Sequence, residues 1–340
     1  RLRIGFSRIR RNRSEKVKKR KYIILGVVTV LLVAVTVVLA YRMQQEKKKE
    51  ADYDEYTSGN QERNYITYKG EKYKYNYDLR TVLFMGIDEE NEIEERKVGD
   101  GGQTDSLVLF AMDTEKKTTK ALSISRDTMT DIKTYDMNGN PLSTERAQIA
   151  LQYAYGDGGR RSCVLTREAV SNLLYQIPIN AYVALTMEGF SKITDELGGV
   201  KITMAEDYTH INPAFKKGET VTLNGEMAQQ YVRYRDTNVS GSNNERMERQ
   251  SLFIEALVQQ LQEEMQGTKD VVQLYKKMEP YMVTDISEGE LKKMINYKLE
   301  GEVDKVPGTV RQGEKYDEFV VDNEKLQEKV VKTFYKREQR

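Results

Sequence analysis

The stretch TVLFMGIDEENEIEERKVGDGGQTDSLVLFAMD, residues 81–113, contains two nearly continuous apolar runs, 81–87 and 106–112. Such runs are typical of strands that are buried on both faces of a sheet. Asp88 closes the first run and Asp105 precedes the second, with a charged, glycine-containing loop between them. The stretch therefore predicts two buried strands, each with a carboxylate at its edge.

A third strand is expected at 118–125, and it leads into Arg126 and Asp127. If consecutive strands pair antiparallel, Asp88, Asp105 and Arg126 gather on one rim of the sheet. Neighbouring carboxylates favour a hard cation such as Mg²⁺, which proteins usually hold with one or two carboxylates plus phosphate oxygens. The alternative is that the two aspartates only cap turns, which aspartate does well.

The rest of the body alternates between helical and extended patterns. Helices are expected around 145–155 and 166–176, at 187–199 and at 245–265, and strands at 179–186 and 200–207. The segment 224–235 is expected to begin as a helix and end extended, and 266–338 to hold helical pieces and short strands. These patterns predict one mixed α/β domain over residues 78–338.

A second cluster of candidate site residues lies in the segment YVRYRDTNVSGSNNERMERQ. In an extended chain, Arg233 and Arg235 point to the same side. Counting back in fours from Ile254 on the apolar stripe of the following helix reaches Gln250 and then Arg246, so both are expected on its buried side. Buried polar groups need partners, and guanidinium groups near a helix N-terminus suit phosphate. The alternative is that these arginines pair with nearby acids.

Two residue types limit the available chemistry. Cys163 and His210 each occur once, so the sequence contains no internal disulfide, no CxxC metal motif and no pair of histidines for zinc. Any catalysis must therefore use carboxylates, arginines, hydroxyl groups and a hard metal ion.

The sequence before the domain predicts a membrane anchor. Residues 22–41 contain no charged side chain, and twenty apolar residues are enough to cross a bilayer core. A cleaved signal peptide is the alternative, although its apolar core is usually shorter. Residues 1–21 carry eleven Arg or Lys and one acid, whereas the remainder of the chain has a net charge of −9.

The basic head, 1–21, predicts that the N-terminus is cytoplasmic and that the body lies outside the cell as a single-pass membrane protein. A nucleic-acid-binding tail is the alternative for this head. Residues 42–77 are expected to form a polar extracellular stalk. An external body without disulfides suits a bacterial cell-surface protein.

The stretches FMGID, TDSLVL, SISRDT, INAYVALTMEGFSKITDELGGV, LNGEMAQQYVRYR and RMERQ occur in the same order as in the LytR-CpsA-Psr family of bacterial cell-envelope proteins, which the chain resembles. The resemblance implies an α/β/α fold with a central mixed sheet and a hydrophobic cavity for a polyprenyl chain. It also implies an enzyme that moves a glycopolymer, such as teichoic acid or capsular polysaccharide, from undecaprenyl pyrophosphate to peptidoglycan.

The resemblance assigns roles to the candidate residues. Asp88 and Asp105 match the metal-site aspartates, for Mg²⁺ with Mn²⁺ as the alternative. The matches to pyrophosphate-binding residues are Arg126, Arg233, Arg235, Arg246 and Gln250. Arg126, Arg233 and Arg235 are also predicted to be catalytic, because they would offset charge developing on the phosphates. Asp127 is predicted to be catalytic as the base that accepts a proton, with Asp88 and Asp105 as the alternatives.

This chain departs from the family pattern at the first basic motif. Ser125 stands where proline commonly precedes Arg-Asp, and TMTDI lacks a further arginine that many members carry. Fewer charges are therefore expected on the pyrophosphate. Three other functions remain open at this stage: a non-catalytic binder of polyprenyl phosphate or glycan, a membrane-bound transcription regulator, and a pyrophosphatase acting on the lipid carrier.

Overall fold

The computed structural model describes residues 65–94, 96–236, 239, 241–265 and 267–338. All of the described residues belong to one compact unit, 63–340. None of the helices within these residues is long and apolar enough to cross a membrane. The expected basic head, membrane span and first part of the stalk lie outside the described residues.

Among the described residues, seven strands form a central mixed sheet in the order β11-β8-β3-β4-β5-β12, with β13 also paired to β5. Their bounds are β3 Leu79–Ile87, β4 Thr104–Asp113, β5 Thr118–Ile124, β8 Ala181–Leu185, β11 Met282–Thr284, β12 Lys298–Leu299 and β13 Asp304–Lys305. The first three pair antiparallel in chain order, and β8 pairs parallel to β3. The predicted α/β class and central strands are confirmed.

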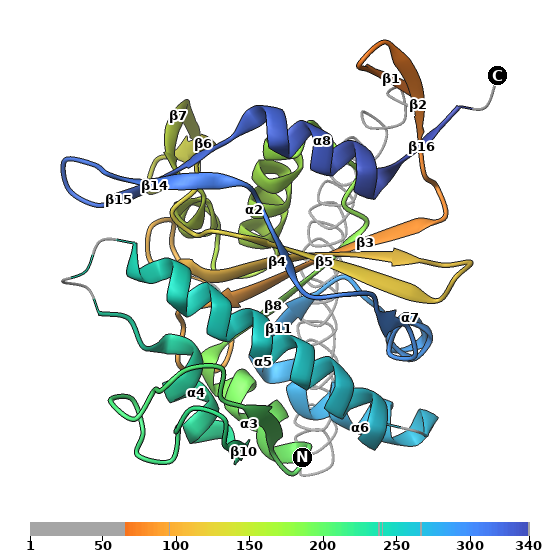
Figure 1. Cartoon of the computed structure of the whole chain (residues 1–340). Coiled ribbons are helices and arrows are strands. Elements are labelled where there is room, and N and C mark those ends of the chain that lie inside the picture. The colour runs from red at the N-terminus through yellow and green to blue at the C-terminus, as the bar shows by residue number, and fades with distance from the viewer. Residues whose placement is uncertain (1–64, 95, 237–238, 240, 266, 339–340) are drawn as a thin grey trace, which may run out of the picture. The chain divides into compact units, whose positions relative to one another are not determined.

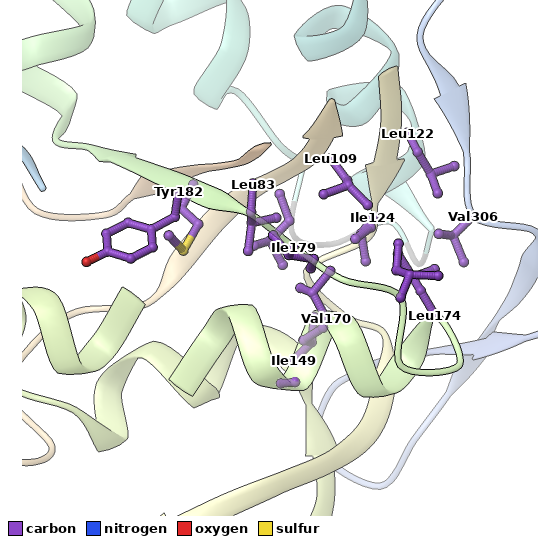
Figure 2. Packing of buried hydrophobic residues seen from close by; sticks show 14 of the residues in the cluster. Leu83, Leu109, Leu122, Ile124, Ile149, Val170, Leu174, Ile179, Tyr182 and Val306 are labelled. Atoms are coloured by element: carbon purple, nitrogen blue, oxygen red, sulfur yellow. The ribbon is translucent and has the colours of Figure 1, made fainter. Parts of the chain in front are cut away.

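Helices cover both faces of this sheet (Figure 1). One face carries α2 Arg160–Leu173, the 3₁₀ helix η1 Ile149–Tyr155 and α8 Asn323–Phe334, and the other carries α3 Met187–Glu196, α5 Ser242–Glu264, α6 Thr268–Met278 and α7 Glu288–Met294. Successive side chains of a strand point to opposite faces. Leu83 and Met85 of β3 accordingly pack toward α2 (Figure 2 shows Leu83 among this cluster), whereas Val82 and Phe84 face the other helices. Both faces are buried, which explains the nearly continuous apolar run.

Smaller sheets surround the central one. Their strands are β1 Tyr65–Tyr68, β2 Glu71–Tyr75 and β16 Tyr335–Arg337; β6 Met129–Tyr135 and β7 Pro141–Gln148; β9 Val200–Thr203 and β10 Thr220–Leu223; and β14 Gly308–Gln312 and β15 Asp317–Val321. The remaining elements are α4 Gly225–Arg233 and the 3₁₀ turn η2 Glu279–Tyr281. The folded domain thus begins before residue 78, because β1 and β2, expected as part of the stalk, pair with each other and with β16.

The helix expected around 145–155 is also wrong in part. Residues 145–148 belong to strand β7, and the helical segment that follows is a 3₁₀ helix. The Asp136 carboxylate accepts the N–H groups of Asn138 and Asn140, which closes the β6–β7 hairpin. Most of β7 is exposed, so no alternation of apolar residues marks it as a strand.

Candidate functional site

The candidate site is built where β3, β4 and β5 end. Leu107 of β4 lies opposite Ile124 of β5, and Ile87 of β3 lies opposite Thr104, so the expected rim forms. The Arg126 guanidinium, just after β5, makes an ion pair with Asp105 of β4. The predicted antiparallel order of the three strands is therefore confirmed, and it brings a carboxylate and an arginine together.

Asp88 lies at the same rim but is exposed to solvent. Its Oδ1 accepts the backbone N–H of Gln103 at 2.5 Å. The Oε1 of Gln103 in turn accepts Nη2 of Arg126 at 2.5 Å. Asp88 therefore does hold the end of its loop, as the turn-cap alternative expects, whereas Asp105 is part of the arginine cluster.

Arg246 reaches the same cluster from the first turns of α5. Its side chain is almost fully buried, and its Nη1 lies 3.9 Å from Oδ1 of Asp105. The Oδ1 of Asn243 accepts Nε and Nη2 of Arg246 at 3.1 and 2.7 Å. Nδ2 of Asn243 donates to Oγ of Ser125 at 3.1 Å, so Ser125 helps to hold this arginine. The expectation that Arg246 lies on the buried side of the helix is confirmed.

Arg235 forms the third arm of the cluster. Its Nε donates to Oγ of Ser242 at 3.1 Å, and its Nη2 lies 3.4 Å from Oδ2 of Asp317. Three chain segments, around Arg126, Arg235 and Arg246, thus bring guanidinium groups together at one rim.

The electrostatics of the cluster reflect burial and like charge. Burial lowers the pKa of Arg126, while Asp127 and Asp88 oppose that effect and Arg235 adds to it. Burial, with repulsion from Arg126 and Arg235, lowers the pKa of Arg246 to about 10. The guanidinium groups of Arg126, Arg235 and Arg246 therefore repel one another at a largely buried position.

Asp127 lies inside this cluster and is 6% exposed. Burial raises its pKa, although Arg235, Arg126 and Arg246 lower it and Asp317 raises it further. Nε2 of Gln148 donates to its Oδ1 at 3.3 Å. The pKa of Asp127 is raised overall, so the effect of burial outweighs that of the neighbouring positive charges.

Arg233 and Gln250 lie beside the cluster at the mouth of a cavity. Arg233 ends α4, and its Nη1 lies 3.3 Å from Oε1 of Glu90. The expectation that Arg233 and Arg235 form one extended pair is wrong, because the helix ends between them and their guanidinium groups reach different partners. Nε2 of Gln250 donates to the carbonyl of Val232 at 3.2 Å.

A cavity of about 270 Å³ lies between the sheet and the helices on its second face. Its lining is almost entirely apolar and includes Phe84, Phe110, Ile254, Val258, Leu261 and Leu274. A smaller hollow of about 60 Å³ continues from it and is lined by Asp105, Arg233 and Gln250. Phe84, Ile254 and Leu257 line both spaces, so the apolar cavity leads to the polar rim.

Several residues that the sequence did not single out complete the site. Arg249 is 2% exposed, and its Nε and Nη2 donate to the carbonyls of Tyr231 and Tyr234 at the end of α4. It is one helical turn after Arg246, a spacing that could have identified it. Asp317 comes from a distant hairpin, and no sequence pattern connects it with Arg235.

The loop between Asp88 and Asp105 is bound to neighbouring segments. The N–H of Arg96 donates to the carbonyl of Asp157 at 2.8 Å, and that of Gly99 to Ala154 at 2.8 Å. Gly101 faces the backbone of Gly158 so closely that a Cβ would lie 2.9 Å from it. The glycine-rich segment 153–160 thus supports this loop.

No group of three or more His, Cys, Asp or Glu side chains within the described residues is placed to share a metal ion. Asp88 and Asp105 supply hard oxygen ligands at adjacent strand ends. Two carboxylates fit Mg²⁺ when phosphate oxygens complete its coordination. Asp105 already pairs with Arg126, so the two carboxylates would hold an ion whose remaining ligands include phosphate oxygens.

The fold and the site define an α/β domain with an apolar cavity that continues to a rim of arginines. The chain belongs to the LytR_cpsA_psr family, whose sequence model matches residues 36–335.

The named relatives agree with this membership. A polyisoprenyl-teichoic acid–peptidoglycan teichoic acid transferase TagU of Bacillus licheniformis is 31% identical over 183 residues, 54% of this chain and 52% of the relative. The TagU of Bacillus subtilis is 28% identical over 249 residues, 72% of each protein. The match thus spans about half the length of the first relative. The crystal structure of B. subtilis TagV, 25% identical, has a TM-score of 0.57 over 75% of this chain and 96% of that chain.

Proposed function

We propose that this protein transfers an anionic glycopolymer, of the teichoic acid or capsular polysaccharide type, from undecaprenyl pyrophosphate to peptidoglycan. The observation that carries the proposal is the continuity between the apolar cavity and the arginine rim through Phe84, Ile254 and Leu257. A polyprenyl pyrophosphate needs an apolar environment for its tail directly beside a cationic environment for its head. The relatives, which are named teichoic acid transferases, support the same activity.

The substrate binds with its isoprenoid chain against the apolar lining and its pyrophosphate at the rim. Arg126, Arg235 and Arg246 neutralise the phosphate oxygens, and Arg233 with Gln250 flanks the point where the chain enters. Guanidinium forks match phosphate oxygens in geometry as well as charge. A cavity of about 270 Å³ has room for only part of a long isoprenoid, so the remainder extends beyond it.

The reaction is a phosphoryl transfer. The oxygen of a peptidoglycan hydroxyl attacks the phosphorus that carries the sugar and forms a new P–O bond. The bond from that phosphorus to the bridging oxygen breaks, and undecaprenyl phosphate leaves with the electron pair. The arginines offset the charge that develops on both phosphates. The hydroxyl proton passes to a carboxylate at the rim. The raised pKa of Asp127 favours it as the proton acceptor, whereas Asp88 is exposed to solvent and so accessible to the incoming hydroxyl group.

Asp88 and Asp105 would hold Mg²⁺ together with the pyrophosphate, with Mn²⁺ as the alternative ion. When bound, the ion supplies positive charge that polarises the phosphate oxygens. The supporting observation is the pair of hard oxygen ligands at adjacent strand ends beside the arginines.

The proposal also places the protein in the cell membrane as a single-pass protein. Residues 1–21 would be cytoplasmic, 22–41 would cross the bilayer, and the domain would lie outside, where peptidoglycan is found. The apolar run and the basic flank support this arrangement.

The direct test is reconstitution of the full chain with a polyprenyl-pyrophosphate-linked glycan, labelled in its sugar, and purified peptidoglycan. Label in the insoluble peptidoglycan, with one polyprenyl monophosphate released per sugar chain, supports the transferase. Label released into solution indicates a pyrophosphatase, and bound lipid without turnover indicates a binding protein. Either of those results contradicts the proposal.

A second test addresses transcription regulation through the basic head. Residues 1–21 are exchanged for an unrelated basic sequence with the same net charge. A transferase keeps its cell-envelope function in complementation, because the head only orients the anchor. Loss of function with intact membrane insertion would favour the regulator.

A further inference from the structure

The hairpin formed by β14 and β15 contacts the chain segments that carry Arg126 and Arg235, although it is distant from both in the sequence. The backbone N–H of Phe319 donates to the carbonyl of Asp127 at 2.9 Å, and Thr128 pairs with Phe319 in a parallel bridge. The Gln148 amide donates to the carbonyl of Asp317 at 2.8 Å. The start of β15 is therefore attached to the segment that carries Arg126 and Asp127.

The side chain of Asp317 attaches the same hairpin to the segment that carries Arg235 and leads into α5. Its Oδ2 accepts the backbone N–H of Gly241 at 2.9 Å and lies 3.4 Å from Nη2 of Arg235. The Asp317 side chain is only 11% exposed, and that of Arg235 is 23% exposed. One carboxylate oxygen thus contacts both Arg235 and the residue just before α5 begins.

We propose that Asp317 is a positioning residue for the pyrophosphate site. It holds the guanidinium of Arg235 in place for a phosphate without contacting the substrate itself, and this inference rests on the proposed function. Arg235 is anchored at Nε by Ser242 and at Nη2 by Asp317. A guanidinium has five N–H donors, so two anchors still leave donors for phosphate oxygens. Anchoring lowers the side-chain entropy that binding would otherwise cost.

A simple electrostatic role predicts the opposite effect on binding. A carboxylate beside an anion site repels the anion, and Asp317 already raises the pKa of Asp127 as a like charge does. If repulsion were its main effect, removing the charge would tighten phosphate binding. If Asp317 positions Arg235, removing the charge weakens binding despite the more positive site. The sign of the change separates the two roles.

The test is calorimetric binding of inorganic pyrophosphate to the full chain in detergent, with transfer rates measured in parallel. Asp317→Asn keeps the size of the side chain and an acceptor oxygen for Gly241, so folding should be retained, which thermal unfolding checks. Binding is expected to weaken by about 3- to 10-fold, the cost of one newly mobile long side chain. The matched control is Glu318→Gln, which removes an acid from the next position of the same strand and should change binding by less than about twofold.

A double-mutant cycle gives the decisive comparison. In an Arg235→Gln background, Asp317→Asn should no longer weaken binding, because no guanidinium remains to be positioned, and it should tighten binding slightly. Tighter binding by Asp317→Asn alone, or equal weakening in both backgrounds, overturns the inference. If the unaltered chain binds no pyrophosphate, the proposed phosphate site itself is refuted. A chain that binds pyrophosphate but responds with the wrong sign refutes only the role of Asp317.

Discussion

Arg126 forms an ion pair with Asp105 across 21 residues of sequence, because β4 and β5 run antiparallel and both residues lie at the same rim. The pair lies beside the carboxylate of Asp127 and within reach of Arg246. Asp105, which is proposed to hold a metal ion, thus lies against Arg126 and Arg246, which are proposed to bind pyrophosphate. This arrangement leads to specific expectations for the site, the cavity and the fold.

Replacing Arg126 with alanine should lower the transfer rate by about 10²–10³, the usual cost of removing one preorganised group that stabilises developing charge. Arg126→Lys should recover little, because one ammonium cannot contact Asp105 and Gln103 as a fork does. Initial rates of label transfer to peptidoglycan measure the effect. Arg146→Ala, on exposed strand β7, is the matched control and should retain the rate of the unaltered chain. Unchanged transfer in Arg126→Ala would remove this residue from the site.

The apolar cavity should determine affinity for the isoprenoid chain. Val258→Phe adds a ring to the lining, so it should weaken binding of a long polyprenyl pyrophosphate by about tenfold, in line with one to two kcal/mol of lost burial. Inorganic pyrophosphate, which has no tail, should bind as before. Competition between the two ligands measures the ratio, and Val258→Leu serves as a smaller change at the same position. Equal effects on both ligands would show that the cavity does not hold the tail.

The two rim aspartates should bind Mg²⁺ only when a phosphate ligand is present. Asp88→Asn removes one hard, charged ligand, so the Mg²⁺ concentration needed for half-maximal pyrophosphate binding should rise about tenfold or more, as one lost charge contact typically costs. Titration of Mg²⁺ at constant pyrophosphate measures this shift. Asp100→Asn, in the same loop, is the control for local charge. If Mg²⁺ dependence is identical in Asp88→Asn and the unaltered chain, the metal site lies elsewhere.

Asp127 should give the protein a specific pH dependence of stability. Its pKa is raised in the folded state, so the folded protein binds its proton more tightly than the unfolded chain does. The stabilisation is complete below the ordinary aspartate pKa of about 3.9 and is lost as pH rises through the raised value. Asp127→Asn cannot titrate and lacks this slope.

Denaturant unfolding of both proteins from acidic to neutral pH tests the slope. The unfolding free energy of the unaltered chain, relative to Asp127→Asn, should decline as pH rises. A difference that stays constant across this range would contradict a raised pKa.

Arg249 should contribute to stability more than to chemistry. Its buried guanidinium donates to two carbonyls at the end of α4, and such charged hydrogen bonds contribute about 1.5–3 kcal/mol. Arg249→Met should therefore lower the unfolding free energy by a few kcal/mol, on the order of one or two such bonds. Chemical denaturation measures this loss, with the exposed Arg146→Met as the control. A loss no greater than that of the control would show that this contact is energetically unimportant.

Strands β3, β4, β5 and β8 of the central sheet were predictable because their apolar runs indicate burial directly, whereas the short strands β11, β12 and β13 were not located from the sequence. The rim containing Asp105 and Arg126 followed from strand order alone. Strand β7 was not predictable, because its exposed residues show no apolar alternation and its hairpin depends on the turn at Asp136. The strands β1 and β2 resembled a polar stalk, since their place in the fold comes from pairing with the C-terminal strand β16.

Hydrophobic periodicity was enough to predict the α/β class and the strand order at the rim, and the resemblance to the LytR-CpsA-Psr family supplied the roles of the candidate residues. How the arginines are held depends on tertiary packing. Asn243 joins Arg246 to Ser125, Asp317 binds Arg235, and the cavity continues to the rim. These relationships join segments that are distant in the chain. Their partners are chosen by packing geometry, which no local pattern of residues records.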